Sequence, residues 1–190
     1  LKVDLLSLSA HKLYGPKGMG ALYVRRGVQG DVSAQIHGGG HERGMRSGTL
    51  PTHQIVGMGK AFKIAAERQA EERERLEALR RQFLQGLEEL DGVAVNGSEN
   101  CRVPGIINLS FEGVDAESLM LGLRDLAVSS GSACSSATVE PSYVLRGIGQ
   151  TDSQAHQALR FSLGRYTTAK EVEFAVSRIV DAVSRLRAVR

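Results

Sequence analysis

The clearest pattern in the chain is an apolar stripe near its end. Apolar side chains recur there at alternating steps of four and three, at Val172, Val176, Ile179, Val183 and Leu186. This spacing predicts an amphipathic helix with one buried side. The preceding run Thr168-Ala169-Lys170-Glu171 has the form of a capping box, in which the Thr oxygen and the Glu carboxylate satisfy backbone donors of the first turn. We therefore expect a helix that starts just after Thr168.

A second, longer helix is predicted from Thr52 to about Leu90. Pro51 directly precedes it, and proline is favoured at the first turn of a helix. The first half of this stretch is apolar on more than one side, which favours burial. From Glu67 onward, charges of both signs alternate with apolar residues at steps of three and four, as is typical of a surface helix with one buried stripe. The change of character predicts a domain boundary near residue 66, within this helix.

Shorter patterns predict the remaining elements. Strands are expected at 3–8, 21–25, 93–95, 106–111, 127–129 and 158–163, and short helices at 115–126, 143–146 and 152–157. The glycine-rich polar stretch 29–49 is expected to lack regular structure. Because strands and helices alternate, the fold class is α/β, with a second part that is α/β or α+β. We expect two domains, residues 1–66 and residues 67–190.

Composition narrows the classes of function. The chain has 190 residues, of which 42% are hydrophobic and 24% charged, as is ordinary for a globular protein. A net charge of +3, from 24 basic and 21 acidic residues, argues against direct nucleic-acid binding. No apolar run approaches the roughly 18–20 residues of a membrane-spanning helix, so no membrane association is expected. The first residues already resemble a strand running into a loop, which predicts that the chain begins within a fold.

Cys134 lies in the run VSSGSACSSA, residues 128–137, which contains almost no bulky side chain. Small residues cannot build a core around a thiol, so an exposed or mobile loop is predicted. Exposure suits a thiol that attacks a substrate, although a free cysteine in a loop is more often inert. The other cysteine, Cys101, lies in a polar loop. The two contexts give no sign of a disulfide framework, which favours a reducing compartment.

Lys12 follows a predicted strand and precedes a Gly-Pro turn, in the run SAHKLYGPKG. A lysine that is partly withdrawn from water at such a junction can act as a nucleophile and base. Ser9 and His11 beside it are suited to hold an anion such as a phosphate. Considered alone, Lys12 has a simpler interpretation as a solvated surface lysine, because most lysines are solvated.

Two further segments carry polar groups that could bind an anion. The stretch 37–49, HGGGHERGMRSGT, combines backbone N–H groups with two arginines and Thr49, and a flexible linker is the alternative. Its two histidines could share a metal on a helix, but the triple glycine argues against a helix, so no metal site is expected. Arg160 lies between apolar residues of a predicted strand, where a partly buried guanidinium needs a carboxylate or phosphate partner. A structural salt bridge is the alternative there.

Taken together, four segments resemble the IscS/NifS-type cysteine desulfurases, pyridoxal-phosphate enzymes of aminotransferase class V. The segments are SAHKLYGPKGMGALYVRR, GGGHERGMRSGTLPTHQIVGMG, VSSGSACSSATVEPSYVLR and LRFSLGRYTT, which follow the family's order and spacing. The resemblance covers essentially the whole chain. It implies the C-terminal part of an aminotransferase type I fold, in which residues 1–66 end the large cofactor-binding domain and residues 67–190 form the small α+β domain.

The resemblance implies how the cofactor is held. Lys12 would form the Schiff base with pyridoxal 5′-phosphate and later move the substrate Cα proton. Ser9 and His11 would help to hold the cofactor, Ser9 chiefly at its phosphate. Thr49 would reach the cofactor phosphate of the neighbouring subunit, so that a homodimer forms part of the active site.

The resemblance also implies a substrate and a path for sulfur. Arg160 would pair with the α-carboxylate of L-cysteine, and Cys134 would attack the substrate sulfur, leaving L-alanine and a persulfide. Cys134 could also ligate an iron-sulfur cluster transiently. The implied partners are iron-sulfur scaffold and sulfur-acceptor proteins, for cluster assembly and tRNA thiolation. The implied location is the cytoplasm of a bacterium, or the mitochondrion if the source is eukaryotic.

The chain departs from the family in extent, because the upstream half, which would carry further cofactor contacts, is absent. We therefore expect the isolated chain to be inactive. One alternative is another class V enzyme, such as a selenocysteine lyase or an aminotransferase, and the latter would need Lys12 and Arg160 but no loop thiol. The other alternative is a non-catalytic fragment that only binds partners.

Overall fold

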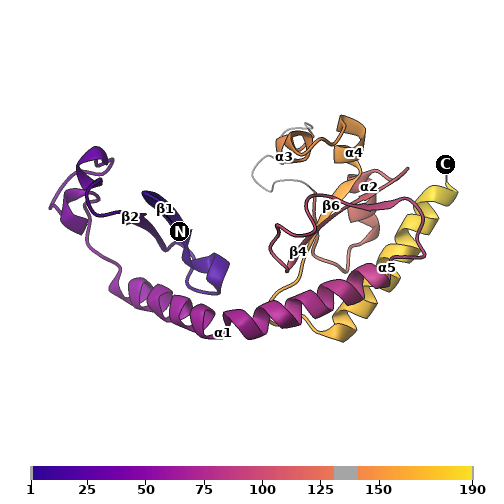
Figure 1. Ribbon diagram of the computed structural model, residues 1–190, viewed down its shortest axis with the longest axis horizontal. Helices are drawn as coiled ribbons and strands as arrows, with labels where there is room; N and C mark the ends of the chain where they lie inside the picture. The colour runs from indigo at the N-terminus through magenta and orange to yellow at the C-terminus, as the bar shows by residue number, and fades with distance from the viewer. Residues whose placement is uncertain (1, 131–140, 190) are drawn as a thin grey trace. The chain divides into compact units, whose positions relative to one another are not determined.

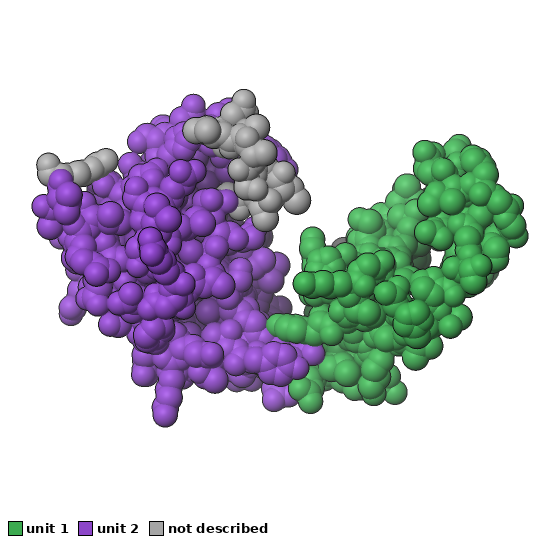
Figure 2. Space-filling model, turned by 180° about the vertical axis from the view of Figure 1, so that it is seen from behind, with its two compact units in different colours: residues 1–70 green, residues 71–190 purple. Residues whose placement is uncertain are grey.

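The computed structural model describes residues 2–130 and 141–189 (Figure 1). The chain divides into two compact units, residues 1–70 and residues 71–190, which Figure 2 colours separately. Their assignment to a large and a small domain, with a boundary near residue 66, stays a prediction. No helix in the described ranges is long and apolar enough to cross a bilayer.

The elements of the first unit are β1 (Leu5–Ser9), the 3-10 turn η1 (Ala10–Leu13), β2 (Gly20–Val24), η2 (Gln29–Asp31), η3 (Glu42–Gly44) and the beginning of α1 (Thr52–Gln85). The second unit contains the rest of α1, followed by β3 (Val93–Val95), β4 (Ile106–Phe111), α2 (Ala116–Gly122), β5 (Ser129–Ser130), α3 (Tyr143–Gly147), α4 (Asp152–His156), β6 (Ala158–Ser162) and α5 (Ala169–Ala188).

The first unit is built on an antiparallel hairpin. Its strands pair from Leu5 opposite Val24 to Ser9 opposite Gly20, one or two residues from the predicted bounds. The stretch 29–49 is mostly irregular as expected, but it contains the two 3-10 turns η2 and η3. These turns are three residues each, too short to produce a helical pattern of apolar positions.

Helix α1 begins at Thr52 as predicted but ends at Gln85, not near Leu90. The chain continues through turns, and Leu87 is nevertheless 3% exposed. Helix α2 behaves in the same way, since it ends at Gly122 although Leu123 is fully buried. In both places the apolar spacing continues because the turn after the helix still faces the core.

The second unit contains a four-stranded antiparallel sheet in the order β3-β4-β6-β5. The predicted strands at 93–95 and 106–111 agree with β3 and β4 residue for residue. One face of the sheet packs on α1, α2 and α5, and α3 and α4 lie on the other side (Figure 1). The core on the first face is made by large side chains that are under 2% exposed, including Phe83, Ile107, Leu109, Phe111, Leu159 and Ile179.

Helix α1 is fastened to the loop between β6 and α5 by charged groups. Arg75 donates hydrogen bonds to the backbone carbonyls of Thr167, Gly164 and Arg165, at 2.7, 2.8 and 2.7 Å. Glu72, one turn earlier, pairs with the Arg165 guanidinium, whose side chain is 9% exposed. Charged side chains of the second half of α1 therefore bind the loop between β6 and α5 as well as facing solvent.

The start of α5 confirms the predicted capping box and gives a first test. Thr168 Oγ1 accepts the Glu171 backbone N–H at 3.3 Å, and the Glu171 carboxylate accepts the Thr168 N–H at 2.7 Å. We expect Thr168→Ala to lower the free energy of unfolding by about 1 kcal/mol, because one backbone donor loses its acceptor. Urea titration measures the change. Lys170→Ala, in the same exposed turn, is the matched control, and an equal loss in both variants would contradict the role of the cap.

The same box gives α5 a dependence on pH. Hydrogen bonds from the Thr168 backbone and then from its hydroxyl hold the pKa of the Glu171 carboxyl below its ordinary value. A lowered pKa means that this contribution is complete above the pKa of the unfolded chain and is lost as pH falls through the folded value. The acid side of the stability profile should therefore flatten only in part in Thr168→Ala, which removes the hydroxyl donor but keeps the backbone donor.

Candidate functional site

Lys12 lies at the apex of a short closed turn. Strand β1 ends at Ser9, and η1 carries Lys12 until Tyr14, whose φ of 63° is left-handed, ends the turn. The Ala10 N–H donates to the Met19 carbonyl at 3.0 Å, and the Gly15 N–H donates to the Ala10 carbonyl at 2.9 Å. The turn is thus tied at both ends, and the Lys12 side chain is exposed.

The first part of α1 packs closely against this turn and the residues that follow it. A Cβ at Gly15 would lie 3.0 Å from the Ala10 carbonyl oxygen and 3.1 Å from Ala61 Cβ. A Cβ at Gly57 would lie 3.1 Å from Pro16. These approaches leave little room for a side chain, which explains the glycine at the end of the Lys12 turn and the one in the facing part of α1.

Ser9 and His11 share the turn with Lys12. Ser9 Oγ lies 3.4 Å from His11 Nδ1, and the His11 ring is exposed. A hydroxyl, an imidazole and a primary amine therefore come within one turn of chain. This set offers donors to an anion and an amine to an electrophile.

Thr49 is exposed at the end of a loop that is ordered by its own hydrogen bonds. Ser47, 4% exposed, accepts the Gly40 N–H at 3.2 Å, and His41 Nδ1 accepts the Gly48 N–H at 3.3 Å. These two hydrogen bonds favour an ordered loop over the flexible-linker alternative. Across the described residues, no three His, Cys, Asp or Glu side chains gather as a metal ion would require.

Arg160 lies in β6 within the second unit. It is directly opposite Asn108 of β4 and Ser129 of β5, and its Nη2 lies 3.4 Å from Ser129 Oγ. Its side chain is half-buried. Within residues 2–130 and 141–189 no carboxylate forms an ion pair with it, so the structural salt bridge considered above is not found there.

Cys134 lies outside the described residues, so its role stays a prediction. Strand β5, which precedes its segment, ends at Ser130, opposite Leu159. The last described residue before that segment, Ser130, therefore lies beside the strand that carries Arg160. Cys101 is exposed, and its N–H donates to Ser98 Oγ at 3.1 Å.

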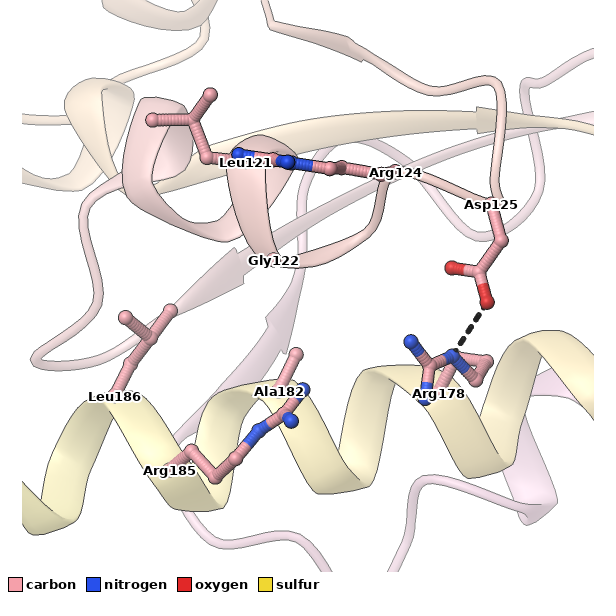
Figure 3. Close-up of a pocket in the computed structure, with 8 residues that line it drawn as sticks. All are labelled: Leu121, Gly122, Arg124, Asp125, Arg178, Ala182, Arg185 and Leu186. Carbon is pink, nitrogen blue, oxygen red and sulfur yellow. Dashed lines mark ion pairs between the residues drawn. The ribbon is translucent and has the colours of Figure 1, made fainter.

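A groove of about 590 Å³ lies between the end of α2 and α5 (Figure 3). Three arginines, two leucines and Asp125 line it, and Arg178 Nε lies 2.7 Å from Asp125 Oδ2 across the gap. None of the predicted site residues lines this groove. It is therefore a feature apart from the Lys12 turn and from Arg160.

Residues 1–174 match the class V aminotransferase family. The chain belongs to this family. It is 61% identical over 187 residues to "Cysteine desulfurase IscS" from Tolumonas auensis, and 60% identical over 189 residues to the protein of that name from Methylococcus capsulatus. These alignments cover 98% and 100% of the chain but 46% and 47% of the relatives. The chain thus spans about half the length of the curated relatives it matches.

Solved structures agree with the class V fold. A NifS-like protein superimposes with a TM-score of 0.85 at 34% identity, covering 97% of this chain and 47% of that one. A NifS-like protein from Rickettsia africae gives a TM-score of 0.85 at 25% identity, covering 96% and 48%. The expected aminotransferase-type fold, represented by part of its length, is confirmed.

Class V aminotransferases use pyridoxal 5′-phosphate, the cofactor expected from the sequence. The residues present in the first unit fit this group. An exposed amine at Lys12 can bond to an aldehyde carbon, and the Ser9 hydroxyl and the His11 ring stand in the same turn.

Sequence reasoning missed that Asn108 lies opposite Arg160, and that Asn96 bonds to Asn108 and Ser110. A local signal was present in strand β4. Its residues alternate, and the positions of Asn108 and Ser110 are polar while Ile107, Leu109 and Phe111 are buried in the core. Polar side chains on the second face of a strand indicate that this face meets something other than apolar core.

Proposed function

We propose that the whole protein is a cysteine desulfurase, which converts L-cysteine to L-alanine and holds the sulfur as a persulfide on Cys134. The observation that carries the proposal is the closed turn that presents Lys12 beside Ser9 and His11 in a class V chain. Relatives about 60% identical that bear the name cysteine desulfurase support it. In this proposal residues 1–66 belong to the large domain and residues 67–190 to the small one.

Four of the proposed cofactor contacts would come from described side chains. When bound, pyridoxal 5′-phosphate supplies an electron sink for the bonds at the substrate Cα. Lys12 would anchor it through Nζ and then accept the Cα proton at the same atom. Ser9 and His11 would donate to it, and Thr49, exposed at its loop end, would donate to the phosphate of a neighbouring subunit in a homodimer.

The substrate would be held and cleaved by two further side chains. Arg160 would hold the α-carboxylate, since its planar guanidinium can bond both carboxylate oxygens. The Cys134 thiolate would attack the substrate sulfur, forming the S–S bond as the C–S bond breaks. The electron pair of the broken bond stays on carbon, which is then protonated to give alanine. Small neighbours of Cys134 suit a thiol that first takes up sulfur and then delivers it.

The wider context follows from the same proposal. The persulfide would pass to sulfur-acceptor proteins and to an iron-sulfur scaffold, and part of the sulfur would serve tRNA thiolation. Cys134 would also be available as a transient cluster ligand. The expected location is the bacterial cytoplasm, or the mitochondrion of a eukaryote.

The test uses the full-length protein with L-cysteine and no reductant. We expect one alanine for each sulfur bound, and a mass increase of one sulfur atom on the peptide that contains Cys134. The peptide that contains Cys101 is the internal control and should stay unmodified. Alanine release with no sulfur on Cys134 would contradict the proposal.

The 190-residue chain alone is expected to release no alanine. Leu5, Leu22 and Tyr23 of the β1–β2 hairpin are 51%, 53% and 48% exposed. A two-stranded hairpin with exposed apolar side chains is marginally stable by itself, which supports the proposal that residues present in the longer relatives cover it. Alanine release by this chain at the full-length rate would overturn that expectation.

A further inference from the structure

A row of polar side chains crosses the sheet of the second unit through Arg160. Asn108 in β4 is the direct cross-strand partner of Arg160 in β6, and Ser129 in β5 is its partner on the other side. Directly opposed residues in an antiparallel pair place their side chains on the same face, with Cβ atoms about 4.5–5.5 Å apart. Ser110, two residues after Asn108, lies on that face as well.

Hydrogen bonds fix the orientation of the Asn108 amide. Asn96 Nδ2 donates to Asn108 Oδ1 at 2.6 Å and to Ser110 Oγ at 2.8 Å. Ser110 Oγ donates to the Gln154 carbonyl at 3.2 Å, which leaves its lone pairs to accept from Asn96. In this arrangement the Asn96 NH₂ group lies between its two partners and meets the Asn108 carbonyl oxygen, while Asn96 Oδ1 is buried with no hydrogen-bond partner among the described residues.

The consequence is that Asn108 presents its NH₂ group away from Asn96. No hydrogen bond to a protein acceptor is found for that group in the described part of the chain. The neighbouring Arg160 guanidinium carries only donors, and the acceptor found for it there is Ser129 Oγ at 3.4 Å. Two donor groups on directly opposed residues, both partly exposed, can together bind an anion that has at least two oxygens.

We propose that Asn108 is a second recognition residue for the substrate α-carboxylate, acting beside Arg160, and that Asn96 is its positioning residue. The inference rests on the proposed function, because it takes the carboxylate to be that of L-cysteine. Arg160 supplies the charge, and the Asn108 amide supplies a further N–H in a fixed orientation. A neutral amide at this position is required, since a carboxylate opposite Arg160 would pair with it and compete with the substrate.

The test is Asn108→Asp in the full-length holoenzyme. The change keeps the side-chain shape but replaces the donor with a negative charge opposite Arg160. We expect KM for L-cysteine to rise about tenfold to a hundredfold, the range expected for losing a charge-assisted contact, while kcat changes far less. The dissociation constant of L-alanine, measured by calorimetry, should rise in parallel. Asn100→Asp, in an exposed loop, carries the same change of charge and should alter neither value.

Thermal unfolding separates recognition from a merely structural role. An Asp opposite Arg160 forms a favourable cross-strand pair, so the melting temperature of Asn108→Asp should not fall. Asn108→Ala removes the donor without adding a charge and should raise KM less than Asn108→Asp does. Unchanged KM and unchanged alanine binding in both variants of an active enzyme would overturn this inference alone. A parent enzyme that releases no alanine from L-cysteine would overturn the proposed function, and this inference with it.

Discussion

Lys12→Ala in the full-length protein is expected to reduce alanine release from L-cysteine by a factor on the order of 10³ or more. The variant removes the amine that would anchor the cofactor and that would also move the Cα proton. No other primary amine lies in the same turn, since η1 contains only Ala10, His11, Lys12 and Leu13. Steady-state alanine formation measures the loss. The absorbance band that appears on adding pyridoxal 5′-phosphate to the parent should be displaced.

Lys17→Ala is the matched control for Lys12→Ala. Lys17 lies in the same exposed loop, and the contact found for it is made by its backbone carbonyl, which accepts from Gln54 Nε2 at 3.5 Å. Its side chain can therefore be removed without loosening the turn. Equal losses in both variants would indicate a general effect of charge, and a Lys12→Ala enzyme with parental activity would contradict the proposed function.

Phe83→Ala is expected to lower the free energy of unfolding by about 3–5 kcal/mol. Phe83 is 1% exposed and its ring centroid lies 5.2 Å from that of Phe161, which in turn meets the edge of Phe111 at 6.3 Å. The side chain joins α1 to the sheet at the centre of the core, so its removal leaves a cavity among rigid neighbours. Chemical denaturation followed by circular dichroism measures the change.

Phe174→Ala provides the control for this loss. Phe174 lies on α5, in the same unit, and is 49% exposed. Truncating it removes the same atoms but creates no cavity, so the change should stay within about 0.5 kcal/mol. If both variants lost equal stability, the dominant role of the Phe83 core contact would be wrong.

The sequence predicted the elements whose pattern reflects both hydrogen bonding and burial. Strands β3 and β4 and the capping box of α5 appear where the residues placed them. The ends of α1 and α2 were predicted too late, because periodic leucines report burial and not backbone geometry. After Gln85 the core is still reached through a turn at Gly86, where a Cβ would lie 2.7 Å from Val176 Cγ1. That contact with α5 depends on tertiary packing and leaves no local signal.

The candidate site divides in the same way. The turn that contains Ser9, His11 and Lys12 could be predicted from the sequence, because these residues lie within one short segment. Asn108 and Arg160 become neighbours only through the register of β4 with β6. An alternating strand shows that Asn108 faces away from the core, but it does not show which residue lies opposite. Pairing between distant strands is a property of the folded sheet.

The Arg75 clamp joins parts of the chain that are 89 to 92 residues apart in sequence. Its three acceptors are backbone carbonyls, so no change of side chain at Gly164, Arg165 or Thr167 removes them as acceptors. Variation can therefore proceed at the acceptor positions more freely than at Arg75, where one substitution releases all three bonds. If the part of α1 that contains Arg75 unfolds, the loop that precedes α5 also loses these three hydrogen bonds. These two helices should open as a single cooperative unit and not one after the other.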